Sequence, residues 1–160
     1  MKAVVTVGTH TPLVQRFEHN SEDAYNSIVK NPKGWEKYNQ NYWQTNLEDF
    51  AEFFSEQLFV EPHSTIQRED VRNWSEGTTG KILAASMAAP YAGQYALDKA
   101  AYQRIACPML VVHGRLDPIA PLAASEKIAE LTGCDLLIFD QAGHAPHARY
   151  PAKFNLSMRN

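Results

Sequence analysis

Two side chains suited to acid–base chemistry, Asp117 and His144, each follow a short apolar run in the last third of the chain. Asp117 comes shortly after residues 109–112, and His144 comes shortly after residues 136–139. Both runs are typical of strands buried in a parallel sheet. Because the carboxyl ends of neighbouring parallel strands meet at one edge of the sheet, we expect the carboxylate and the imidazole to lie close together. Such a pair makes two members of a nucleophile–histidine–acid triad.

Each of these two residues also has a purely structural interpretation. Asp117 precedes Pro118, where an aspartate commonly forms an Asx-turn or caps a helix, and this role is compatible with a catalytic one. His144 could instead cap the helix that follows it. In a catalytic role the histidine would transfer protons, while the aspartate would fix its tautomer and stabilise the imidazolium.

The third member of a triad, the nucleophile, has no counterpart among the motifs of this sequence. A serine nucleophile of an open parallel sheet sits on a strand–turn–helix elbow with the pattern Gly-x-Ser-x-Gly, which is absent from the 160 residues. Ser86 and Ser125 fall within predicted helices, and Cys107 lies at the opposite end of its strand from the expected site. We therefore expect none of the three to be the nucleophile.

The segments around both candidates resemble the C-terminal part of the α/β-hydrolase family. The resemblance covers about residues 100–160 and rests on Val-Val-His-Gly-Arg-Leu-Asp-Pro, Ala-Gly-His-Ala-Pro-His and Tyr-Pro-Ala-Lys-Phe. In that family the acid follows the penultimate strand and the histidine follows the last strand. The resemblance therefore implies that Asp117 and His144 are the acid and histidine of an ester or acyl hydrolase. The first strands of that fold, its oxyanion loop and its nucleophile elbow have no counterpart in this sequence.

The alternation of strands and helices predicts an α/β fold with right-handed crossovers. The strands are expected over 3–7, 108–113 and 136–139, giving a short parallel sheet of about three strands with flanking helices and a helical lid, a partial α/β-hydrolase fold. Residues 1–14 and 92–160 would form the partial core, and residues 15–91 the lid or cap. We expect the exposed edge of strand 3–7 to pair with another chain, because unpaired apolar edges are templates for pairing.

Capping signals and helical spacing predict where the helices lie. Within residues 20–90, a helix starts at Asn31-Pro32, a break falls near Thr45-Asn46, a capping box occupies 64–67 and Gly77 ends that helix. Further helices are predicted over 79–89, 92–104 and 121–131, the last with Gly133 just past its end, and from Pro151 onward. The dense aromatic residues between Trp35 and Phe59 form either the core between the lid helices and the sheet or the wall of a pocket for an acyl or aryl group.

Composition and charge exclude several classes of partner. The formal net charge of −3 and the scattered lysines and arginines argue against nucleic acid. No apolar run is long enough to cross a membrane, and no signal peptide is expected, so we predict a cytoplasmic protein. Cys107 and Cys134 are interpreted as small apolar residues at strand ends rather than as a disulfide.

No metal or cofactor is predicted, because His10, His113, His144 and His147 lack the spacing of a ligand set. His113 is expected to be packed in the interior, whereas His10 could line the cleft.

Two functional hypotheses follow from the incomplete triad. In the first, the chain supplies the acid and histidine of a hydrolase whose nucleophile comes from a complementing N-terminal hydrolase chain, and its ligand is a small apolar ester or acyl compound. In the second, the chain is a non-catalytic remnant that forms a homodimer through strand 3–7 and binds a small apolar ligand. Neither hypothesis involves nucleic acid or a membrane.

Overall fold

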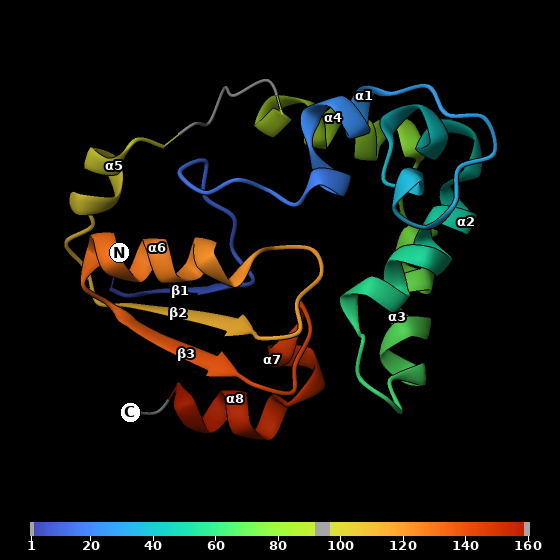
Figure 1. The fold of residues 1–160 in the computed structure, drawn as a ribbon. Helices are drawn as coiled ribbons and strands as arrows, with labels where there is room; N and C mark the ends of the chain where they lie inside the picture. Colours follow the sequence, from blue (N-terminus) through green and yellow to red (C-terminus); the bar gives the residue numbers. More distant parts are fainter. Residues whose placement is uncertain (1, 92–96, 159–160) are drawn as a thin grey trace. The chain divides into compact units, whose positions relative to one another are not determined.

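A computed structural model of the chain describes residues 2–91 and 97–158 (Figure 1). The contacts between Cα atoms divide the chain into two compact units. The sheet unit contains Met1–Gln15, Gln57–Ser64 and Leu97–Asn160, and the helical unit contains Arg16–Glu56 and Thr65–Ala96. The segment Gln57–Ser64 thus lies with the sheet, although it falls in the middle of the range 15–91 that the sequence assigned to a lid.

The sheet unit is built on three parallel strands, as predicted. β1 (Val4–Val7), β2 (Met109–Gly114) and β3 (Asp135–Phe139) lie in the order β1-β2-β3. Val7 of β1 is level with Val112 of β2, which is level with Leu137 of β3. The carboxyl ends of the three strands therefore reach the same edge of the sheet. β2 is the central strand, and its Val111 and Val112 are completely buried.

Helices cover both faces of this sheet, which is why its strands are apolar on both sides. α5 (Lys99–Gln103) and α6 (Leu122–Thr132) contribute Tyr102 and Ile128 to a core with Val111. On the other face, Val112 and Phe139 pack against residues from α8 (Pro151–Ser157), which follows the short α7 (Pro146–Arg149). Figure 1 shows α6 and α8 on opposite sides of the three strands.

The helical unit has a core of aromatic side chains. Its elements are η1 (Glu18–Asn20), α1 (Glu22–Asn26), η2 (Gly34–Lys37), the part of α2 (Gln40–Leu58) up to Glu56, α3 (Thr65–Ser75) and α4 (Gly80–Tyr91). Trp43, which is 1% exposed, meets Tyr25 edge-on at a ring-centroid distance of 5.5 Å. Phe50 and Ala84 complete this cluster. The aromatic residues predicted for this region therefore serve mainly as core.

Several predicted helix boundaries are correct and one is wrong. The break in α2 falls at Asn46 (φ −137°, ψ 42°), and Gly133 ends α6 in a left-handed conformation (φ 68°), both as predicted. Asn31 does not start a helix, because its φ is 55°. The start of α2 lies at Gln40 instead, where the Asn39 side chain accepts hydrogen bonds from the N–H groups of Asn41 and Tyr42 at 2.8 and 3.2 Å. The Asn39 carboxamide replaces the cap predicted for Asn31.

The capping box predicted at 64–67 and the helix predicted over 92–104 are only partly found. α3 does start at Thr65, but the buried hydroxyl of Ser64 makes no hydrogen bond within the described residues. Residues 92–96 lie outside the described residues, and α5 occupies only Lys99–Gln103 of the remainder. None of the helices in the described ranges is long and apolar enough to cross a membrane.

Candidate active site

The turn after β2 holds the carboxylate of Asp117 in a fixed position. One carboxylate oxygen, Oδ1, accepts hydrogen bonds from the N–H groups of Ile119 (2.7 Å) and Ala120 (3.0 Å). The Asp117 N–H donates in turn to the Gly114 carbonyl at 3.1 Å. The aspartate thus forms the turn predicted from Asp117-Pro118, and its second oxygen remains available for another partner.

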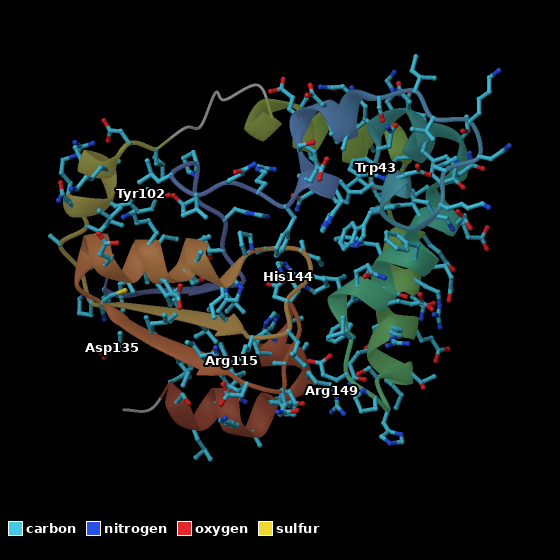
Figure 2. All side chains as sticks on the ribbon, viewed as in Figure 1. Trp43, Tyr102, Arg115, Asp135, His144 and Arg149 are labelled. Atoms are coloured by element: carbon cyan, nitrogen blue, oxygen red, sulfur yellow. The ribbon has the colours of Figure 1, made fainter. Side chains whose placement is uncertain are left out.

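That second oxygen, Oδ2, lies 2.8 Å from Nδ1 of His144. The two residues selected from the sequence therefore meet at the carboxyl ends of β2 and β3. Because a carboxylate accepts, Nδ1–H of the imidazole donates, and Nε2 carries the free lone pair. The Asp117 side chain is only 1% exposed, whereas the His144 side chain is 23% exposed. This arrangement presents a basic nitrogen next to solvent with an acid fixed behind it. In Figure 2, His144 lies at one end of the strands, and Asp135, the first residue of β3, lies at the other end.

The end of β1 forms the support beneath the His144 ring. Gly8 follows β1 with φ 57°, and a Cβ atom added there would lie 2.8 Å from Cε1 and 2.9 Å from Nδ1 of His144. A side chain at this position would displace the ring or bend the turn. All three strands consequently contribute to the site, since β1 supports the imidazole, β2 leads to the acid and β3 leads to the base.

A serine–histidine–aspartate series lies next to the Asp117–His144 pair, but its serine and histidine are closed to solvent. Nδ1 of His113 is 2.7 Å from the Ser125 hydroxyl, and its Nε2 is 3.1 Å from the Ala120 carbonyl and 3.4 Å from Asp117 Oδ2. A carbonyl only accepts, so Nε2–H donates to Ala120 and the Ser125 hydroxyl donates to Nδ1. His113 and Ser125 are both 0% exposed. Both residues support the Asp117 turn. His113 is thus packed in the interior, as predicted from the sequence.

Burial lowers the pKa of His113 from its ordinary value, although the nearby Asp117 carboxylate opposes this effect. The ring is therefore neutral in the folded protein at neutral pH, in agreement with the tautomer that its hydrogen bonds require. The pKa of His147 is also lowered, first by partial burial and then by the charge of His144.

The two cysteines and Ser86 do not join the site. Cys107 and Cys134 are half-buried free thiols near the amino ends of β2 and β3, at the opposite edge of the sheet. Ser86 lies in α4 of the helical unit, and its hydroxyl donates to the Leu83 carbonyl at 2.8 Å. His10 lies in the loop after β1. Among the described residues, no group of three or more histidine, cysteine, aspartate or glutamate side chains is arranged to hold a metal ion.

One residue that the sequence analysis missed is Glu61, which is 3% exposed and whose Oε1 accepts a hydrogen bond from the Gly143 N–H at 2.7 Å. The sequence around Glu61 does contain a signal that this side chain is buried. A carboxylate placed between the apolar run 58–60 and Pro62 is unusual, because a buried charge requires a specific partner.

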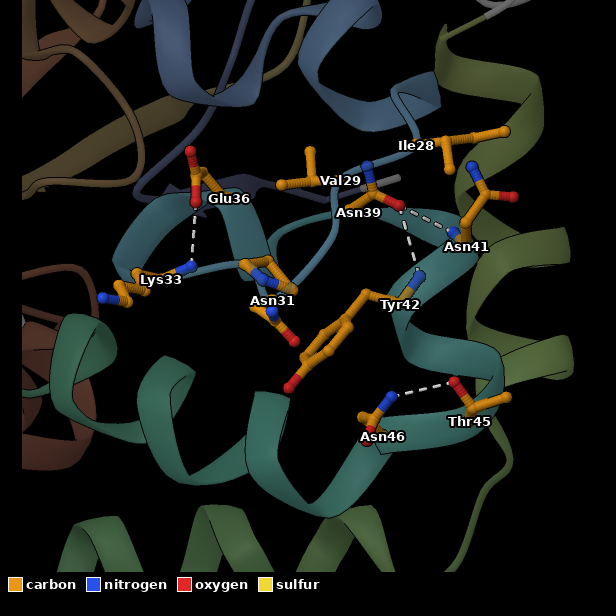
Figure 3. Close-up of a pocket in the computed structure, with 11 residues that line it drawn as sticks. Ile28, Val29, Asn31, Lys33, Glu36, Asn39, Asn41, Tyr42, Thr45 and Asn46 are labelled. Carbon is orange, nitrogen blue, oxygen red and sulfur yellow. Dashed lines mark hydrogen bonds between the residues drawn. The ribbon is translucent and has the colours of Figure 1, made fainter.

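The hollow shown in Figure 3 belongs to the helical unit alone and has a volume of about 540 Å³. Four of its eleven lining residues are asparagines, including Asn39 and Asn41. The Asn39 carboxamide oxygen caps α2 and is already occupied by two N–H groups. This hollow contains neither Asp117 nor His144, and Tyr42 is its only aromatic wall residue.

With the acid–histidine pair and the parallel sheet established, the family of the chain can be stated. A family profile described as alpha/beta hydrolase fold matches residues 1–148. The chain therefore belongs to the alpha/beta hydrolase fold family. A search of curated proteins gave no match to the chain.

Solved structures of hydrolases share this fold at low sequence identity. A serine hydrolase from the polyaromatic-hydrocarbon-degrading bacterium Cycloclasticus zankles has a TM-score of 0.70 at 16% identity, covering 98% of this chain and 53% of its own. The 2-hydroxy-6-oxo-6-phenylhexa-2,4-dienoate hydrolase from Rhodococcus sp. strain RHA1 has a TM-score of 0.65 at 18% identity, with coverages of 98% and 53%. An esterase from Exiguobacterium antarcticum has a TM-score of 0.65 at 19% identity, with coverages of 74% and 44%. The chain spans about half the length of these hydrolases.

The contact between Gly8 and His144 leads to a testable prediction. We expect Gly8→Ala to displace the imidazole and change its NMR signals, whereas Gly34→Ala should not. Gly34 is a matched control, because its φ of 52° is similar but a Cβ there would meet nothing within 4 Å. Both variants should lose about 1–2 kcal/mol from the left-handed backbone. The measurement is the ¹H–¹⁵N correlation spectrum of the histidine rings in the wild type and both variants. Identical His144 signals in all three proteins would contradict the contact.

The buried neutral His113 leads to a prediction about pH. An unfolded histidine gains its proton as the pH falls through about 6.5, while the folded His113 ring gains it only at lower pH. In this interval the unfolded state binds more protons, so the free energy of unfolding falls with falling pH, by up to about 1.4 kcal/mol per pH unit for one group.

Urea unfolding between pH 7.5 and 5 measures this slope. We expect His113→Gln to reduce the slope, even though it also lowers the stability at pH 7.5. The exposed-residue control His63→Asn should keep the slope of the wild type. An unchanged slope in His113→Gln would show that the ring does not carry the effect.

Proposed function

We propose that this chain contributes the acid and the histidine of a hydrolase site that transfers an acyl group to water. The observation that carries the proposal is the hydrogen bond between Asp117 and His144. The acid is buried and fixed by two backbone N–H groups, and the base is partly exposed. A histidine oriented in this way is suited to general base catalysis, because its free Nε2 can accept a proton from a nucleophile.

In the proposed mechanism the nucleophile is a hydroxyl group supplied from outside these 160 residues. As its oxygen attacks the acyl carbon, the hydroxyl proton moves to Nε2 of His144, and Asp117 stabilises the imidazolium. The proton then passes to the leaving alcohol, thiol or amine, which departs and leaves the acyl group on the nucleophile. In the second half, the water oxygen attacks the acyl carbon while His144 takes a proton from that water. The bond between the acyl carbon and the nucleophile's oxygen then breaks, the carboxylic acid departs, and the proton passes from His144 to the nucleophile's oxygen.

The free edge of β1 is the place where we propose that the missing part of the site attaches. Within the described residues β1 pairs only with β2, and its Val5 is 45% exposed. The N–H groups of Val4 and Gly8 bond to residues of the β2 side. Since successive N–H groups of a strand point to opposite sides, those of Val5 and Val7 face the free edge. A parallel strand added here would end beside Gly8 and His144, where a nucleophile is needed.

The complementing strand would belong to an N-terminal hydrolase polypeptide, whether separate or linked to this chain. This is supported by the relatives, whose chains are about twice as long as the matched part. A second copy of this chain could occupy the same edge as a homodimer. A two-fold axis would make the two β1 strands antiparallel, so this dimer would bring no nucleophile to His144.

For the substrate we propose a small apolar ester or acyl compound. The similar proteins support this class, because they include an esterase and a serine hydrolase. The two free thiols suit a reducing compartment, and we propose that the chain acts in the cytoplasm.

The central test measures hydrolysis of p-nitrophenyl butyrate. The chain alone should give no turnover that depends on His144. Mixing it with a polypeptide that carries the preceding strands, the nucleophile elbow and the oxyanion loop should restore turnover. In that complex Asp117→Asn should lower kcat by about 10⁴-fold, and His144→Ala should lower it at least as much. The control Ser86→Ala, in α4 of the helical unit, should leave kcat unchanged. A complex that forms and yet remains inactive would contradict the proposal.

A second test addresses the edge of β1. Val5→Pro removes one outward N–H and spares the hydrogen bonds between β1 and β2, and proline is tolerated on such edges. We expect this variant to fold and to lose assembly, as measured by light scattering after size exclusion. Thr6→Val is the matched control, because it changes a side chain of the same strand and keeps every backbone N–H. Assembly that survives Val5→Pro would place the interface elsewhere.

A further inference from the structure

We propose that residues 58–62 form a strap that fixes the turn carrying His144, with Glu61 as the positioning residue. This inference rests on the proposed role of His144 as the base, but the contacts that support it are independent of any nucleophile. All of the residues in the strap and in the His144 turn belong to the sheet unit.

The central contact is the hydrogen bond between the Glu61 carboxylate and the backbone of Gly143. Oε1 of Glu61 accepts from the Gly143 N–H at 2.7 Å, and Gly143 immediately precedes His144. A hydrogen bond to an ionised acceptor is about twice as strong as one between neutral groups. This N–H belongs to the peptide between Ala142 and Gly143, one peptide before the bond that joins Gly143 to His144. Fixing its orientation restricts the path by which the main chain enters His144.

The remainder of the strap packs against both sides of the same turn. A Cβ added at Gly143 would lie 3.0 Å from the Val60 side chain and 3.3 Å from the Leu58 carbonyl. After His144, the Arg149 guanidinium donates to the Pro62 carbonyl at 3.1 Å. The strap thus contacts the chain just before His144 and again five residues after it.

The chemistry of Glu61 argues against a role in packing alone. Burying a carboxylate is unfavourable unless it is paired, and an apolar residue would fill the same space more favourably. Oε2 of Glu61 is buried and makes no hydrogen bond within the described residues, and Nε of Arg149 is in the same condition. The charge is therefore directed at the Gly143 amide rather than at a cation. Unsatisfied groups of this kind call for a functional explanation.

The strap also connects the site with two helices. Its first residue, Leu58, is the last residue of α2, and α3 begins at Thr65 shortly after its end. The strap therefore continues through the main chain directly into both helices.

The first experiment uses the wild-type chain alone and needs no activity. Acid titration followed by NMR reports the Glu61 carboxyl carbon, the Gly143 amide and the His144 ring in one sample. We expect the Gly143 amide signal to move with the same midpoint as the Glu61 carboxyl. A Gly143 amide signal that does not move as Glu61 is protonated would overturn the proposal.

The second experiment compares Glu61→Ala, Glu61→Gln and the exposed control Glu56→Ala. Glu61→Ala should raise the hydrogen-exchange rate of the Gly143 amide at least about tenfold and shift the His144 ring signals. Glu61→Gln keeps an acceptor oxygen, so both readouts should be nearly those of the wild type. The control Glu56→Ala should leave both readouts unchanged. Normal exchange and normal ring signals in a folded Glu61→Ala would overturn the proposal. If Glu61→Ala does not fold, the wild-type titration and Glu61→Gln decide the question.

In the complemented enzyme, Glu61→Ala should lower kcat by about 10²-fold with little change in KM, because misplacing a catalytic group by about 1 Å has that effect. Glu61→Gln should recover most of this loss. If His144→Ala has no effect on turnover, the proposed function fails, whereas the coupling between Glu61 and His144 is still decided by the NMR readouts.

Discussion

The site depends on how closely the turn after β2 approaches the turn after β3. A Cβ at Gly114 would overlap the carbonyl oxygens of Ala142 and Gly143. Without a side chain, the turn at Gly114 comes close enough for the Leu116 N–H to bond to the Ala142 carbonyl at 2.9 Å. This contact between two backbones sets the distance between Asp117 and His144, so the acid–base pair is a property of the main chain as much as of its side chains.

Below this contact, polar groups fill a position that is usually apolar. Ser125, His113 and the Ala120 carbonyl satisfy one another in the interior, next to the Asp117 carboxylate. A network of this kind is stable only when every member finds its partner, because unpaired polar groups in a low dielectric are costly. The network explains why a histidine lies next to the last residue of β2, a strand otherwise composed of apolar residues and glycine.

The sequence was sufficient to predict the three parallel strands and the meeting of Asp117 with His144, because both follow from short-range patterns. Apolar runs define the strands, and parallel strands bring the residues that follow them to one edge. The start of α2 was not predictable in the same way. Asn31-Pro32 has the local form of a helix start, but Asn39, eight residues later, provides the cap.

Glu61 was missed because its partner is far away in the sequence. The Gly143 amide is 82 residues distant, and no local pattern reports such a contact. The same holds for the assignment of Gln57–Ser64 to the sheet unit. Hydrophobic periodicity describes the element to which a residue belongs, but it does not say which surface that element covers.

The double use of the Asp117 carboxylate has an evolutionary consequence. Oδ1 organises the turn that leads into α6, and only Oδ2 faces His144. Natural selection on folding alone would therefore retain the aspartate, whether or not its carboxylate takes part in catalysis. The His144 ring plays no comparable part in organising a turn, since it is partly exposed and rests against a glycine. Among descendants of such a chain, His144 would be substituted before Asp117, because the fold itself requires the aspartate.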